Sequence, residues 1–99
     1  MIDITVQPDK ITVSGHAGYA EPGKDIVCAA VSTLTQVFIA SVEELTAAKI
    51  YHAVTSGYTV IDIIESTERA QVLIDSFLLG CEIVAENYPD YVRVLGGKK

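Results

Sequence analysis

The chain has 99 residues, 49% of them hydrophobic and 20% charged, which allows one modest core and excludes a disordered chain. Its formal net charge is −6 and its seven Lys and Arg residues are spread along the sequence, which excludes a typical nucleic-acid-binding domain and favours a basic partner. We expect a single domain over residues 1–99.

The first ten residues, MIDITVQPDK, lack the basic start and apolar run of a secretory signal peptide. No apolar stretch of ~18 residues is free of polar side chains, so no membrane span is predicted. Two cysteines do not make a disulfide framework. The expected location is therefore the cytoplasm, where thiols stay reduced.

The N-terminal quarter predicts a β-hairpin followed by a loop. Apolar residues alternate over residues 2–7 and again over 10–16, with the turn residues Pro8 and Asp9 between them. Residues 17–24 contain two glycines and a proline, which is typical of a loop.

The rest of the chain predicts two helices separated by a second hairpin. Apolar residues then recur every three or four positions, which predicts a helix over 25–46 with Asp25 as its N-cap. A hairpin is predicted over 49–66, a second helix over 66–89 and a short last strand over 91–95.

The order ββαββαβ predicts an α+β fold. Two amphipathic helices would cover one face of a mainly antiparallel five-stranded sheet, which makes a two-layer sandwich. The strand TVIDII, residues 59–64, carries apolar residues on both faces. We therefore expect a second copy of the chain to cover the other face, as a homodimer.

A phosphate-binding loop is one interpretation of residues 18–25, GYAEPGKD, which almost fit GxxxxGK[ST] between a strand and a helix. Asp25 stands where the motif needs a hydroxyl for magnesium, and Glu21 would repel phosphate. An antiparallel domain also lacks the parallel sheet of such proteins. A connecting loop explains the glycines more simply.

A cysteine nucleophile is the second interpretation. Cys28 falls in the opening turn of the first helix, where unpaired amides and the helix dipole favour a thiolate and could stabilise an oxyanion. His16 ends the preceding strand, from which the loop could fold back and bring its imidazole to the sulfur. Asp25 lies one turn before Cys28, and Ser32 lies one turn after it.

Each of these residues also has a simpler interpretation. A cysteine between apolar neighbours is more often a small buried side chain, a histidine at a strand end more often lies on the surface, and Asp25 is most simply a helix cap. Spacing alone does not decide between catalysis and structure.

The segment GHAGYAEPGKDIVCAAVS, residues 15–32, closely resembles the signature of the Prp family of bacterial ribosomal-processing cysteine proteases. The length of the chain and its ββαββαβ order are also similar to that family. The resemblance implies an endopeptidase that removes the N-terminal extension of large-subunit ribosomal protein twenty-seven. It also implies a homodimer, and cleavage after aromatic residues in an apolar groove.

Carried over by position, the resemblance makes Cys28 the nucleophile and His16 the general base. Supporting motif residues would be Gly15, Asp25 and Ser32. Gly18 and Gly23 would let the loop close over the substrate, Tyr19 would either pack on an apolar substrate side chain or anchor the loop, and no metal or other cofactor is implied.

Other polar and reactive groups are interpreted as structural. Cys81 is expected in the core, His52 at the surface, and Glu43 and Glu44 on a solvated helix end. Gly80, inside the second helix, predicts close approach of a neighbouring element.

Two further functions stay open on the sequence alone. A non-enzymatic acidic dimer could bind a basic ribosomal protein or assembly factor, and Cys28 would then be buried and inert. A nucleotide-binding protein would need affinity that depends on Lys24.

Overall fold

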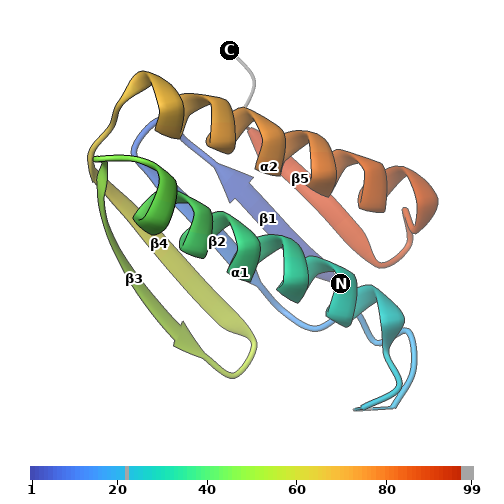
Figure 1. Ribbon diagram of the computed structural model, residues 1–99. Coiled ribbons are helices and arrows are strands. Elements are labelled where there is room, and N and C mark those ends of the chain that lie inside the picture. The colour runs from blue at the N-terminus through green and yellow to red at the C-terminus, as the bar shows by residue number, and fades with distance from the viewer. Residues whose placement is uncertain (22, 97–99) are drawn as a thin grey trace.

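The computed structural model describes residues 1–21 and 23–96, and it has the predicted order of elements (Figure 1). The elements lie within a few residues of their predicted bounds, and the part of the tail beyond residue 96 lies outside the described residues. They are β1 (Ile2–Val6), β2 (Lys10–Ser14), α1 (Ile26–Leu45), β3 (Lys49–Thr55), β4 (Tyr58–Glu65), α2 (Glu68–Asn87) and β5 (Val92–Gly96).

The five strands form one sheet in the order β3-β4-β2-β1-β5. β1 pairs in parallel with β5, and the other three pairings are antiparallel. α1 and α2 lie side by side on one face of the sheet (Figure 1). The predicted α+β fold, with two helices on one face of a mainly antiparallel sheet, is confirmed.

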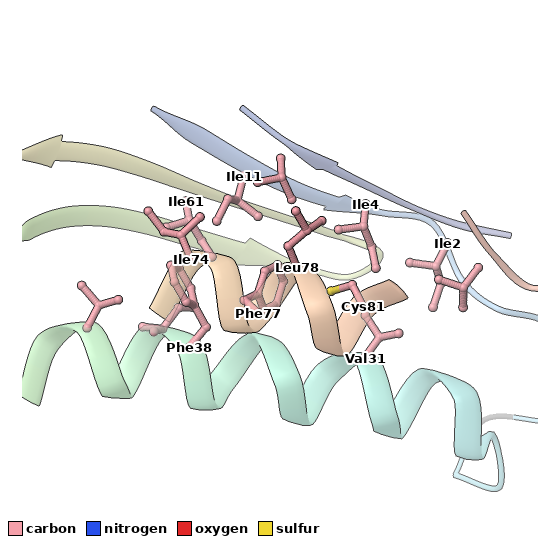
Figure 2. Close-up of a cluster of buried hydrophobic side chains, with 14 of the residues drawn as sticks. Ile2, Ile4, Ile11, Val31, Phe38, Ile61, Ile74, Phe77, Leu78 and Cys81 are labelled. Carbon is pink, nitrogen blue, oxygen red and sulfur yellow. The ribbon is translucent and has the colours of Figure 1, made fainter. Parts of the chain in front are cut away.

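The core lies between the sheet and the two helices (Figure 2). Alternate strand residues point to opposite faces, so β1 contributes Ile2, Ile4 and Val6 to the helix side. Phe38 of α1 meets Phe77 of α2 with ring centroids 5.2 Å apart, which joins the two helices.

Gly80 and Cys81 have structural roles in α2. A Cβ at Gly80 would lie 2.8 Å from Leu34 Cδ2, so the glycine permits the close approach of α1 that the sequence predicts. Cys81 is fully buried, and burial raises the pKa of its thiol to about 12. A thiol held neutral in this way is a packing residue, as expected.

The open face of the sheet is more polar than the sequence suggested. In β4, Ile61 and Ile63 face the helices, which leaves Asp62 on the opposite face. Asp62 pairs there with Lys10 at 3.7 Å. A second ion pair joins Asp3 and Arg93 at 2.9 Å. Two cross-strand ion pairs interrupt this surface, which also carries the exposed apolar side chains of Tyr51 and Ile64.

α1 qualifies the expectation of no membrane span. By length and composition alone this helix could cross a membrane, because its Ser, Thr and Gln residues are only mildly polar and its first charged residue is Glu43. Core helices of globular proteins pass the same test. Here Val27, Val31 and Phe38 of α1 pack in the core under the sheet.

Candidate active site

A pocket of about 550 Å³ lies between α1 and the β3–β4 hairpin. One face of α1 forms its first wall over four turns, with residues at steps of three and four from Cys28 to Glu43. The hairpin forms the second wall, and the end of β2 with His16 closes one end. Both predicted catalytic residues therefore line the same pocket.

Asp25 holds the start of α1, as the sequence predicts. Its Oδ1 accepts hydrogen bonds from the N–H groups of Val27, at 3.0 Å, and Cys28, at 2.9 Å. Its Oδ2 accepts the N–H of Tyr19 at 3.0 Å. One carboxylate thus caps the helix that carries Cys28 and fastens the loop before it. Its hydrogen-bond partners among the described residues are backbone N–H groups, and His16 is not one of them.

The cap changes the expected oxyanion site. The sequence predicted that free N–H groups of the opening turn would stabilise an oxyanion. In the structure, the N–H groups of Val27 and Cys28 already donate to the Asp25 carboxylate. The sulfur instead accepts a hydrogen bond from the N–H of Ala17, which lies 3.4 Å from Cys28 Sγ. Because Ala17 is buried at the start of the loop, this donor is fixed by the fold.

The pKa of the Asp25 carboxyl is lowered from its ordinary 3.8, chiefly by the hydrogen bond from the Cys28 N–H. Ionised Asp25 therefore stabilises the fold fully above about pH 3.8, and this contribution is lost as the pH falls through the lowered pKa of the folded state. We predict that Asp25→Asn lowers the thermal unfolding midpoint near neutral pH and that the difference from wild type shrinks well below pH 3.8.

Calorimetry over a pH series measures this difference, and peptide cleavage by the same variant measures the effect on the loop. We expect cleavage to fall as well, because Asp25 also holds Tyr19. An Asp25→Asn variant with wild-type stability and activity at every pH would show that the cap has neither role.

His16 follows the end of β2 and rests against the turn of the β3–β4 hairpin. A Cβ built on Gly57 would lie 2.7 Å from His16 Nε2, so the imidazole occupies the space that a side chain at Gly57 would need. The Gly57 carbonyl accepts the N–H of Gly15 at 2.8 Å, and the His16 carbonyl accepts a bond from the Met1 amino group at 2.6 Å. The hairpin turn, at the end of the strand next to β2, thus lies against His16, and the sequence did not predict this role for Gly57.

Cys28 and His16 are not hydrogen-bonded to each other in the described part of the chain; the bond at the sulfur comes from Ala17. Cys28 is partly buried against the core and also lines the pocket. His16 is exposed. Both side chains therefore border the same open pocket.

Two supporting residues also line the pocket. Gly15 has a φ of +99°, and a Cβ there would collide with the Met1 carbonyl, so only glycine fits. Ser32 lies one helical turn after Cys28, as predicted, and its side chain is exposed to the pocket.

The loop over residues 17–24, described except for residue 22, is anchored on the far side from the pocket. The Tyr19 ring meets Tyr88 at 5.6 Å and Tyr91 at 5.2 Å between centroids, both edge-on. Tyr19 does not line the pocket as described, so of its two sequence interpretations, substrate contact and loop anchor, the structure has the anchor. Gly18 and Gly23 have φ of +70° and +87°, which glycine adopts freely.

Two residues interpreted as surface groups line the pocket at its other end. Glu43 Oε2 lies 3.7 Å from His52 Nδ1. Lys24, the centre of the phosphate-loop interpretation, is exposed and outside the pocket lining. The helical spacing of Glu43 from Cys28 was the sequence signal that could have placed Glu43 in the groove.

Comparison with known proteins links this geometry to one family. The sequence model described as "Cysteine protease Prp" matches residues 1–93. The ribosomal processing cysteine protease Prp of Mycoplasma pneumoniae is 29% identical over 92 residues, covering 93% of this chain and 91% of that protein. The protein of the same name in Bacillus subtilis is 29% identical over 93 residues, covering 83% and 80%.

Solved structures show the same fold. The ribosomal processing protease Prp of S. aureus, with a covalently linked product peptide, has a TM-score of 0.88 at 24% identity, covering 96% of each chain. SMU.848 from Streptococcus mutans has a TM-score of 0.79 at 32% identity, covering 99% of this chain and 93% of that one.

Proposed function

Because the chain belongs to the Cysteine protease Prp family, we propose that it cleaves a ribosomal protein precursor with Cys28 and His16 as its catalytic dyad. The precursor we propose is large-subunit ribosomal protein twenty-seven, whose N-terminal extension would be removed. The observation that carries the proposal is that both residues line one pocket, with Cys28 in the first turn of a capped helix.

The chemistry follows from this arrangement. His16 accepts the thiol proton of Cys28 across the pocket that both residues line, and the thiolate attacks the scissile carbonyl carbon. The N–H of Ala17, which points at the sulfur, would donate a hydrogen bond to the carbonyl oxygen as negative charge develops on it. The Ser32 hydroxyl, one helical turn after Cys28, is a second donor that lines the pocket. Protonated His16 then gives its proton to the leaving amine, and water hydrolyses the thioester.

The groove fits an extended apolar segment beside the dyad. Val54 and Tyr58, which are 65% and 45% exposed, line the hairpin wall close to Gly57 and His16. Their exposed surface would be covered by an aromatic or aliphatic side chain of the substrate. The net charge of −6 favours encounter with a basic ribosomal protein.

We place this activity in the cytoplasm, where ribosomal proteins are made, and we propose that the protein acts as a homodimer. The outer face of α2 supports a dimer, because Val72, Leu79 and Ile83 are each more than half exposed and share one helical stripe. Sedimentation equilibrium of the full chain tests the stoichiometry.

The decisive experiment incubates the full-length precursor with the protein and measures product masses. We expect one shortened product, and we expect iodoacetamide to stop its formation while it labels Cys28 and spares Cys81. Cys81 is protected because it is buried with a raised pKa. Cleavage that continues after complete labelling of Cys28 would contradict the proposal.

A further inference from the structure

The active-site groove continues well beyond the catalytic pair. Glu43 lies fifteen residues after Cys28 on the same face of α1, which is ~22 Å at ~1.5 Å per residue. An extended peptide rises ~3.3 Å per residue, so six to seven substrate residues would span this distance. The α1 residues that line the groove are Cys28, Val31, Ser32, Thr35, Gln36, Ile39, Ala40 and Glu43.

The charge of the groove is confined to its far end. Among the described residues that line it, Glu43 has the only carboxylate, and none is Lys or Arg. The stretch between Cys28 and Glu43 is apolar or carries neutral hydroxyl and amide groups. A substrate segment that follows the groove therefore meets neutral walls and then one negative charge.

The Glu43 carboxylate is accessible and lies near the opposite wall of the groove. Its side chain is 50% exposed, and Oε2 lies 3.7 Å from His52 Nδ1 on the opposite wall. Glu44, the next residue, lies outside this groove and lines a separate surface depression near the start of α2. The two neighbouring carboxylates thus have the same chemistry and different positions.

We propose that Glu43 forms a subsite for a basic side chain of the substrate, six to seven residues from the scissile bond. The inference rests on the proposed protease function and names a feature of its substrate. A Lys or Arg at that distance would place its cation against the carboxylate while its apolar stem covers Ile39 and Ala40. The subsite would select both the register of the peptide and its charge.

The test uses synthetic peptides with one cleavable sequence taken from the start of the precursor. Every Lys and Arg is replaced by Gln, and a single Lys is then placed at successive positions on either side of the cut. With wild type we expect one position, six to seven residues from the cut, to raise kcat/KM about threefold to fivefold at low salt. Near 1 M salt the gain should vanish.

Three variants test whether the increase in kcat/KM caused by the peptide Lys depends on Glu43. Glu43→Gln should remove it, Glu44→Gln should keep it, and Glu43→Lys should prefer a Glu at the same peptide position. A gain that survives in Glu43→Gln, or no positional gain in wild type, would overturn the inference while the uncharged peptide is still cleaved. If wild type cleaves neither that peptide nor the full precursor, the proposed function itself is wrong.

Discussion

Cys28→Ala is expected to abolish cleavage of the precursor, with a loss of at least about 10⁴-fold in kcat. Cys28 is the proposed nucleophile at the head of the groove, and the alanine leaves the Asp25 cap and the fold unchanged because the cap uses the backbone N–H of residue 28. Mass measurement of the product at fixed times gives the rate. Shortening at the wild-type rate would remove Cys28 from the chemistry.

His16→Ala provides the companion measurement. If the two side chains act as one unit, His16→Ala alone should cost nearly as much as Cys28→Ala, and the double variant should be no slower than Cys28→Ala. Multiplicative losses would instead mean that the residues act independently. Cys81→Ala is the matched control, because it removes a thiol that is fully buried in the core and outside the groove, and its cleavage rate should stay close to wild type.

Local patterns in the sequence were enough to predict the secondary structure. Alternation and helical spacing placed the elements within a few residues, for example 25–46 against the observed Ile26–Leu45. The Asp25 cap was also predictable, since an N-cap depends only on the next three residues. These features arise from interactions between residues close in the chain.

Contacts between distant segments were not predictable in the same way. Tyr19 meets Tyr88 and Tyr91 across the fold, and nothing near Tyr19 in the sequence indicates an aromatic partner. The polarity of the open sheet face likewise depends on which strands become neighbours, since Lys10 and Asp62 meet only through the pairing of β2 with β4. Spacing within one segment carries no information about such pairings.

Gly57 shows what this limit means for the active site. Gly57 lies forty-one positions after His16, and the sequence marks it only as a glycine in a hairpin turn. Its φ is +75°. Only the pairing of Ser14 with Tyr58 brings the turn under the imidazole. The space that the proposed base occupies therefore depends on a residue that carries no side chain.

Gly57→Ala is expected to lower kcat/KM for the precursor about 100-fold, because the new Cβ would lie 2.7 Å from His16 Nε2 and the imidazole must move. A displacement of about 1 Å in a catalytic group can cost this much. In Gly57→Ala, the rate at which Cys28 reacts with iodoacetamide should be measured across a pH series. We expect its pH dependence to resemble that of His16→Ala and to differ from that of wild type. A purely structural defect would lower the stability of the fold and leave the pH dependence of Cys28 alkylation as in wild type.

Gly96→Ala separates the strain of the backbone from the displacement of the histidine. Gly96 has a similar φ of +70°, lies at the end of β5 and has no contact with His16. Both variants should lose similar stability, about 1 kcal/mol, because an L-residue is disfavoured in this conformation. Cleavage by Gly96→Ala should remain within about twofold of wild type, since no catalytic group moves. Equal cleavage by the two variants would mean that the hairpin turn supports the fold and does not position the base.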